Sequence, residues 1–286
     1  MNKLFSDTNR AKLLMIFSAL SFSLMAAVVK ATPHSVAVKS FSRQILSCMF
    51  VLFIILLNNY RIIPLKKNRM KLLLRCLFGT LGIYLYFYSI DYLILANASM
   101  LTRLSPFFVT LFAAIILKEN VNSMNWLIFI PMVIGCIFII KPTSDVFSII
   151  SIYAVLSACS GALAYIMIKS IGKDESAYVI IFWFTFFSSI VYFVIASKEL
   201  LILEEIQYFS LFFIGVLGFI GQVGLTFSYQ ISKASKVAPY SYSYILFAGI
   251  IGYIIWNEIP DKFSMIGYIL IILSYILLIK FQKNSK

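Results

Sequence analysis

The chain alternates long apolar blocks with short polar stretches, and the length of the blocks indicates how they fold. A helix needs roughly 20 mostly apolar residues to cross a hydrocarbon core of about 30 Å, and ten blocks have that length. Membrane β-strands would be shorter, about ten residues with alternating polarity. We therefore expect an all-α integral membrane protein with ten transmembrane helices. The expected spans are about 13–30, 36–57, 72–92, 95–117, 124–140, 147–168, 177–197, 208–231, 236–256 and 263–280.

Composition excludes the main alternatives to a membrane protein. Of 286 residues, 62% are hydrophobic and 12% are charged, about half the charged fraction of an ordinary soluble protein. Long apolar blocks also exclude a disordered chain and a small disulfide-stapled fold. The first block could serve as a cleaved signal sequence, but nine further spans favour a retained first helix. The longest predicted loop runs from Asn58 to Met70, so we expect no soluble domain between the spans.

Positive residues are distributed unevenly between the two sides of the predicted bundle. With the N-terminus inside, seventeen of the 24 Lys and Arg residues fall on that side, including Arg75 at the start of the third span. Five fall on the other side, and Arg43 and Arg103 lie within spans. Because positive residues beside spans tend to stay cytoplasmic, we expect a bacterial inner-membrane protein with both termini in the cytoplasm. The net charge of +13 is then a topology signal with affinity for lipid headgroups, and no nucleic-acid partner is expected.

The two halves of the sequence form an internal repeat. They match without a gap over 63 positions when residue n is laid on residue n+139, starting with Gly79 on Gly218. Glu119 then falls on Glu258. Each half holds five spans, an odd number, so equivalent helices must run in opposite directions through the bilayer, with a substrate site near the midplane between them. The repeats are expected at 1–143 and 144–286.

Two runs of sequence carry a resemblance to a known family. The run ANASMLTRLSPFFVTLFAAIILKE (96–119) and its partner ASKVAPYSYSYILFAGIIGYIIWNEIPD (234–261) resemble the EamA family of the drug/metabolite transporter superfamily. The segment APYSYSY (238–244) is especially similar to the branch that includes S-adenosylmethionine transporters. The resemblance implies alternating access around a central cavity lined by the inner helices of each half, with the fifth and tenth helices peripheral.

Two arginines inside spans are the strongest candidates for substrate binding. An arginine at the bilayer centre costs at least about 2.5 kcal/mol on insertion scales, so Arg43 and Arg103 should face a wet cavity, a partner or the surface. Lys39, Arg43 and Ser47 share one face of the second helix, which suits a cavity wall. A guanidinium there can hold a carboxylate or phosphate of the substrate. An internal ion pair or snorkelling is the alternative for both arginines.

Prolines and tyrosines mark further candidates. Pro106 and Pro239 each remove a helical hydrogen bond, and such breaks are tolerated in membranes where they line a cavity. Tyr240, Tyr242 and Tyr244 follow Pro239, and their hydroxyls need partners in lipid. Other polar or aromatic side chains could contact a substrate by an amide or a ring. These candidates are Tyr84, Tyr88, Asn97, Gln222, Trp183 and Tyr165. For all of these aromatic and amide residues, packing between helices is the alternative.

Acidic residues lie at the ends of spans. Glu119 and Glu258 resemble the family's helix-end glutamate, which implies a structural or gating role. The lack of a carboxylate within a span argues against the mechanism of small multidrug-resistance carriers. The only histidine, His34, falls in an outer loop, where we expect it to be exposed and a poor proton relay.

No enzymatic motif is recognisable. The chain has no Gly-rich phosphate loop with its lysine, no paired carboxylates and no Ser/His/Asp set, and its four cysteines lack metal or disulfide spacing. We expect no cofactor and no metal. The pattern favours a secondary transporter of a small organic metabolite with a zwitterionic or anionic group and a flat or apolar part, such as S-adenosylmethionine or an amino-acid-like compound. Export of drugs or amino acids is the alternative. A lipid-modifying enzyme and a non-transporting scaffold are less favoured, and a coupling ion or counter-substrate is left open.

Overall fold

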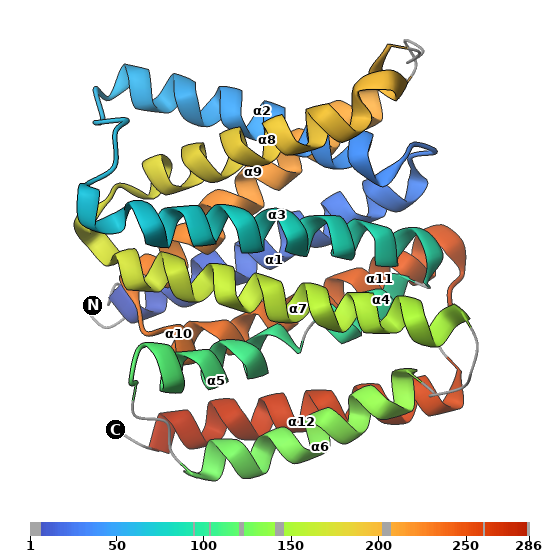
Figure 1. Ribbon diagram of the computed structural model, residues 1–286. Helices are drawn as coiled ribbons and strands as arrows, with labels where there is room; N and C mark the ends of the chain where they lie inside the picture. Colours follow the sequence, from blue (N-terminus) through green and yellow to red (C-terminus); the bar gives the residue numbers. More distant parts are fainter. Residues whose placement is uncertain are drawn as a thin grey trace.

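The chain folds into a bundle of helices, seen in the computed structural model of Figure 1. The structure describes residues 7–93, 95–102, 104–119, 123–140, 146–201, 207–259 and 261–284, and every regular element in these ranges is helical. The α-helices are α1 (Asp7–Ala31), α2 (Val36–Leu57), α3 (Arg69–Tyr92), α4 (Leu95–Thr102), α5 (Ser105–Ile116), α6 (Ser123–Ile140), α7 (Val146–Ile171), α8 (Ala177–Leu200), α9 (Gln207–Ile231), α10 (Ala234–Val237), α11 (Ser243–Trp256) and α12 (Lys262–Asn284). Short 3-10 helices are η1 (Lys66–Asn68), η2 (Gly172–Asp174) and η3 (Ala238–Tyr242).

The predicted ten transmembrane helices are confirmed. Eight segments of the described chain are long and apolar enough to cross a membrane. They are α1, α2, α3, the segment of α4 and α5, α7, α8, α9 and the segment of η3 and α11. Two shorter apolar stretches, Phe129–Ile139 and Lys262–Ser274, lie in α6 and α12. The helices thus divide five and five.

The helix boundaries repeat with the sequence offset. α4 begins at Leu95 and α10 at Ala234, which are 139 residues apart, and α6 begins at Ser123 and α12 at Lys262, with the same separation. In Figure 1, α1 and its equivalent α7 run in opposite directions, as an inverted repeat requires. The start of α1 and the end of α12 lie on the same side of the bundle (Figure 1).

The fourth span of each half is a broken helix. α4 ends at Thr102 and α5 begins at Ser105, so that Pro106 stands in the first turn of α5, where its missing N–H costs nothing. In the second half η3 separates α10 from α11, and Pro239 lies at the start of η3. α4 packs against α11, and α5 against α10. The breaks expected near the two prolines therefore occur where the halves meet.

Glycines bring the central helices close together. α9 packs against α1 and α2, and a Cβ added at Gly224 would lie 2.9 Å from the carbonyl oxygen of Leu14. The Oγ of Ser18 donates a 2.6 Å hydrogen bond to the carbonyl oxygen of Gly221 one turn away. Such small residues let membrane helices approach closely enough for backbone contact.

The pair α6 and α12 is set apart from the central helices. The two pack along each other and lie together at one edge of Figure 1. A Cβ added at Gly135 of α6 would lie 2.7 Å from the carbonyl oxygen of Gly267 of α12, so this contact depends on the missing side chains. The peripheral position expected for the fifth and tenth helices agrees with this arrangement.

Candidate functional site

A cavity of about 110 Å³ lies between the two halves. It is lined by residues of α1, α2, α3, α4, α5, α7, α8, α9 and α11, and by none of the described residues of α6 or α12. The break between α4 and α5 supplies Thr102 and Ser105 to the wall, and α11 supplies Tyr244. The cavity is thus built by the inner helices of both repeats, at their broken fourth spans.

The lining follows the internal repeat at four positions. Four lining residues of the first half have repeat mates, 139 positions later, in the second half. These four mates also line the cavity. The pairs are Phe22 with Gly161, Met25 with Ala164, Ile83 with Gln222, and Ser105 with Tyr244. The pseudo-twofold relation between the repeats therefore passes through the cavity, where an inverted-repeat transporter binds its substrate.

Arg43 of α2 lies in the cavity wall and is 4% exposed. Its Nη1 donates a 2.9 Å hydrogen bond to Oε1 of Gln44, and its guanidinium carbon lies 5.6 Å from the ring centroid of Phe22. Its Nε is buried without a hydrogen-bond partner. Arg43 thus faces the space between the halves rather than lipid, and its Nε can still donate a hydrogen bond.

Arg75 is a cavity residue that the sequence reasoning missed. We counted it among the positive residues beside the cytoplasmic loops and not among the site candidates, but Arg75 is 2% exposed and lines the cavity. Its guanidinium carbon lies 3.7 Å from the ring centroid of Phe184 on α8. The side chain turns inward because Gly79, one turn further along α3, lacks the Cβ that would collide with Nη1 of Arg75. A glycine four residues after an arginine just inside a span could therefore have indicated, from the sequence, that Arg75 turns inward.

Three other predicted site residues line the cavity. Tyr165 of α7 stacks on Tyr229, with ring centroids 5.0 Å apart and an interplanar angle of 19°. Gln222 of α9 is 4% exposed, and its Nε2 donates a 3.0 Å hydrogen bond to Oγ1 of Thr226. Tyr244 is fully buried and shares a hydrogen bond with the hydroxyl of Tyr86 across the two halves. Their role in binding stays a prediction.

Four predicted residues make contacts away from the cavity lining. Tyr84 stacks on Tyr192, and Tyr88 lies against Tyr92 and Tyr153. The Oδ1 of Asn97 accepts a 3.0 Å hydrogen bond from the hydroxyl of Tyr268, and Nε1 of Trp183 donates a 2.9 Å hydrogen bond to the carbonyl of Ile62. The partners of these four side chains are thus other residues of the protein, outside the cavity lining.

The remaining predicted residues lie around the helix breaks. Tyr240 packs under Nζ of Lys12, 4.9 Å from its ring centroid, and the hydroxyl of Tyr242 donates a 3.1 Å hydrogen bond to Sδ of Met132 on α6. Neither is in the cavity lining. Arg103, the other intramembrane arginine, lies outside the described residues, so its predicted role stays a prediction.

Glu258 ties the end of α11 to the start of α4. Its Oε1 forms an ion pair with Nζ of Lys30 at the end of α1, and its Oε2 accepts a 3.1 Å hydrogen bond from the backbone N–H of Leu95. The repeat mates of Lys30 and Glu258 are Lys169 and Glu119, and the charge of Glu119 acts on Lys169. The inverted repeat therefore places one lysine and one glutamate at each end of the bundle.

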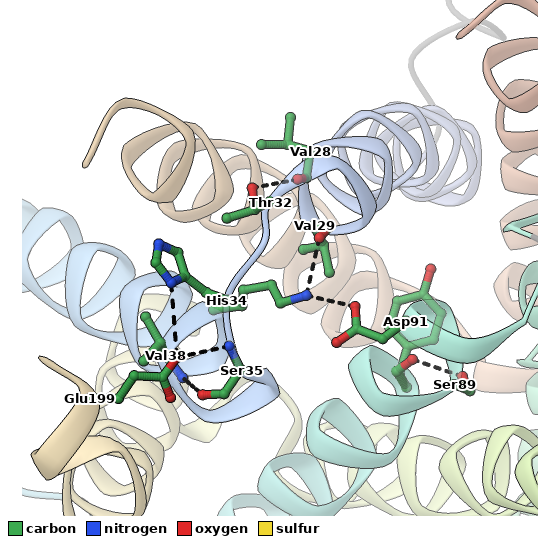
Figure 2. Close-up of polar contacts among 11 residues, drawn as sticks. Val28, Val29, Thr32, His34, Ser35, Val38, Ser89, Asp91 and Glu199 are labelled. Atoms are coloured by element: carbon green, nitrogen blue, oxygen red, sulfur yellow. Dashed lines mark hydrogen bonds and ion pairs between the residues drawn. The ribbon is translucent and has the colours of Figure 1, made fainter. Parts of the chain in front are cut away.

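A second ion pair lies at the same end as Lys30. Nζ of Lys39 is 2.6 Å from Oδ1 of Asp91 and also donates to the carbonyl of Val29, so Lys39 joins α2 to α1 and α3 rather than facing the cavity. Figure 2 shows Asp91 and Val29 on either side of the side-chain nitrogen that contacts both, with His34 and Glu199 nearby. The expectation of an exposed His34 is wrong, because its side chain is 8% exposed and its Nδ1 lies 3.9 Å from Oε1 of Glu199.

Comparison with protein families gives two matches along the chain. The EamA-like transporter family matches residues 9–141 and again residues 148–280. The two matches start 139 residues apart, the offset found in the sequence and in the helix boundaries.

Individual relatives cover most of the chain. The pseudopaline exporter of Pseudomonas aeruginosa is 32% identical, covering 95% of this chain and 96% of the relative. The S-adenosylmethionine uptake transporter of Rickettsia prowazekii is 26% identical, over 74% of this chain and 72% of the relative. Human solute carrier family 35 member G1 is 27% identical, over 91% and 76%. One solved structure, described only as the crystal structure of a protein, has a TM-score of 0.69 at 12% identity, covering 96% of this chain and 98% of its own, which shows a shared fold.

Proposed function

Since the chain belongs to the EamA-like transporter family, we propose that it carries a small organic metabolite across the bacterial inner membrane by secondary transport. It is a multi-pass membrane protein, and its relatives are named as transporters of small molecules rather than as enzymes. In the proposed mechanism the two five-helix repeats move against each other, so that the central cavity opens to one side of the membrane at a time. Both termini then face the cytoplasm.

The pseudo-symmetric cavity is the observation that carries this proposal. Its lining includes four pairs of equivalent positions from two repeats that run in opposite directions, so a rearrangement that opens one end has a counterpart, related by the pseudo-twofold axis, at the other. The fourth spans are interrupted between α4 and α5 and between α10 and α11, and an interrupted membrane helix can free backbone groups from helical hydrogen bonds. Membranes tolerate such groups where they face a cavity or are covered by protein.

The two lysine–glutamate sets supply gates for this motion. Glu258 binds Lys30 and the first residue of α4, so it fastens the broken helix of the first half to the end of α11. Glu119 and Lys169 occupy the equivalent positions at the other end of the bundle. We propose that the Lys30–Glu258 pair closes the cavity at one side and that its repeat mates close it at the other, with only one of the two closed tightly in each state.

The substrate class follows from the cavity chemistry. Arg43 offers a charged donor for an acidic group, and the rings of Phe22, Tyr165 and Phe184 offer flat apolar contacts. A zwitterionic or anionic metabolite with an apolar part satisfies both. S-adenosylmethionine and amino-acid-like compounds belong to this class, and a relative at 26% identity is named as an S-adenosylmethionine uptake transporter.

Exchange in proteoliposomes tests the proposal. Purified protein is reconstituted into vesicles loaded with unlabelled metabolite, and uptake of the same labelled compound is measured without ATP for S-adenosylmethionine and a panel of amino acids. We expect saturable exchange of at least one compound, lost in Arg43→Gln and retained in Arg61→Gln, which removes an exposed loop guanidinium. Because the relatives include both an exporter and an uptake transporter, both flux directions are measured. Exchange no faster than in empty vesicles for the whole panel would contradict the proposal.

A further inference from the structure

We infer that Arg43 and Arg75 act together on a substrate with two acidic groups, so that the cavity selects dicarboxylate metabolites. This inference rests on the proposed transport function and narrows its substrate class. It starts from Arg75, which no sequence motif assigns to a site, and from the shared surroundings of the two guanidiniums.

Both arginines are buried without the partners that buried charges need. Arg75 is 2% and Arg43 is 4% exposed, and the Nε of each is buried without a hydrogen-bond partner. In the part of the chain that the structure describes, no carboxylate lies within 4.0 Å of either guanidinium. Buried charges are ordinarily paired, because an unpaired charge in a low dielectric is costly. The missing negative groups are those of the ligand.

The two charges also act on each other. Arg43 and Arg75 come from different helices, and their positive charges repel across the cavity. A ligand with one acidic group relieves only part of this repulsion, whereas a ligand with two acidic groups neutralises both charges. Electrostatics therefore favours a dianion over a monoanion in the same space.

Repeat-mate glycines seat the two side chains. Gly79 leaves room for the head of Arg75, and a Cβ there would also lie 2.6 Å from Cε2 of Phe184. Gly218, 139 positions later, leaves room for the stem of Arg43, because a Cβ there would lie 2.8 Å from Cγ of Arg43. Each half thus provides one glycine, and each glycine accommodates one arginine at the cavity wall.

Ring contacts orient the guanidiniums for binding. Arg75 lies over Phe184 at 3.7 Å and Arg43 lies over Phe22 at 5.6 Å. A guanidinium stacked on a ring keeps its N–H donors in its own plane, where they can bind a carboxylate with two parallel hydrogen bonds. Two such groups lining one cavity suit two carboxylates joined by a short apolar linker. S-adenosylmethionine, with one carboxylate and two cationic centres, is then expected to bind more weakly than a dicarboxylate.

A charge-matched ligand series tests the inference in the intact protein. Binding to purified wild type is measured by titration calorimetry and thermal shift for aspartate, glutamate, succinate and glutarate, each paired with its monoamide. We expect at least one dicarboxylate to bind on the order of ten- to a hundredfold more tightly than its monoamide, the effect of one charged hydrogen-bonding group. The inference is overturned if every monoamide binds as well as its acid, or if none of the acids binds.

Variants of Arg75 test whether this residue causes the preference. In Arg75→Gln the preference for the acid over its monoamide should disappear, whereas Arg75→Lys should keep part of it. Arg69→Gln, which removes an exposed guanidinium from the start of the same helix, should keep the full preference. If Arg75→Gln fails to fold, the partial loss in Arg75→Lys together with the wild-type series decides. An unchanged preference in both Arg75 variants would overturn the inference. Exchange of a monoacid without dicarboxylate preference would overturn the inference and leave the transport proposal standing. Dicarboxylate binding without exchange would contradict the transport proposal and leave only the binding preference of the cavity.

Discussion

The two five-helix halves share a frame but differ in what they present to the cavity. Four lining positions are occupied by repeat mates, and the fourth span is broken at equivalent places in both halves. Yet Arg43 and Arg75 both come from the first half, and their mates in the second half are Phe182 and Ile214. The second half contributes Gln222 and Tyr244 instead. The repeat therefore supplies the geometry for opening either end, while substrate chemistry is concentrated in one half.

Replacing an arginine by its repeat mate should have the largest effect. Arg43→Phe makes the two halves alike at this position, and the cavity loses a donor for the acidic group. We expect exchange in proteoliposomes to fall on the order of a hundredfold, as when a charged hydrogen-bonding group is lost. The control change at the mate, Phe182→Tyr, does not alter a charge and should leave exchange near wild type. Equal loss in both variants would show that the asymmetry between the halves does not set substrate binding.

Breaking the gate ion pair should have the next largest effect. Lys30→Glu puts two like charges together beside the start of α4, so we expect exchange to fall roughly tenfold. Combining it with Glu258→Lys restores opposite charges and should recover part of the rate. Lys67→Glu is the control, because Lys67 of η1 and Asp174 of η2 form an ion pair of exposed side chains. A double variant as impaired as Lys30→Glu alone would rule out a gate formed by this pair.

Adding a side chain at Gly79 should have a smaller effect on stability and exchange, directed at the position of Arg75. A Cβ at Gly79 meets both Arg75 and the ring of Phe184, so Gly79→Ala should lower the unfolding free energy by about 1–3 kcal/mol and shift Arg75. Gly249→Ala is the matched control in α11, because a Cβ there meets nothing within 4 Å. Thermal unfolding and exchange are measured for both. If Gly79→Ala behaves like Gly249→Ala, the glycine does not position the arginine.

The smallest effect is expected where a predicted residue contacts protein rather than cavity. Trp183→Phe removes the 2.9 Å hydrogen bond to the carbonyl of Ile62. We expect a loss of about 1 kcal/mol in stability and exchange within a factor of two of wild type. The measurements are thermal unfolding, with and without saturating substrate, and exchange in proteoliposomes. A loss of exchange without a loss of stability would contradict this prediction and indicate that Trp183 contacts the substrate.

Much of the fold could be predicted from the sequence because hydrophobic block length and the offset of 139 are one-dimensional signals. The same holds for the helix breaks, since Pro106 and Pro239 mark their places directly. Arg43 could be singled out because a charge deep within an apolar block has few other uses.

The rest depends on which neighbour covers which face of a helix. Arg75 lies near the start of its span, where a positive residue ordinarily reaches the interface, and only the contact with Phe184 of α8 reveals that it turns inward. Tyr84 and Trp183 carry the polar groups expected of site residues, but their partners are Tyr192 and the carbonyl of Ile62. Periodicity identifies a helix face and does not identify the segment packed on it.

Accessibility of repeat-mate positions in the cavity tests the central claim most directly. In a variant without native cysteines, Ser105→Cys and its mate Tyr244→Cys are labelled with a membrane-impermeant maleimide in right-side-out and inverted vesicles. Two inverted repeats that open in turn predict that each position reacts from both sides, and that a transported substrate slows both reactions. Reaction from one side only, under all substrate conditions, or from neither side, would contradict alternating access through this cavity.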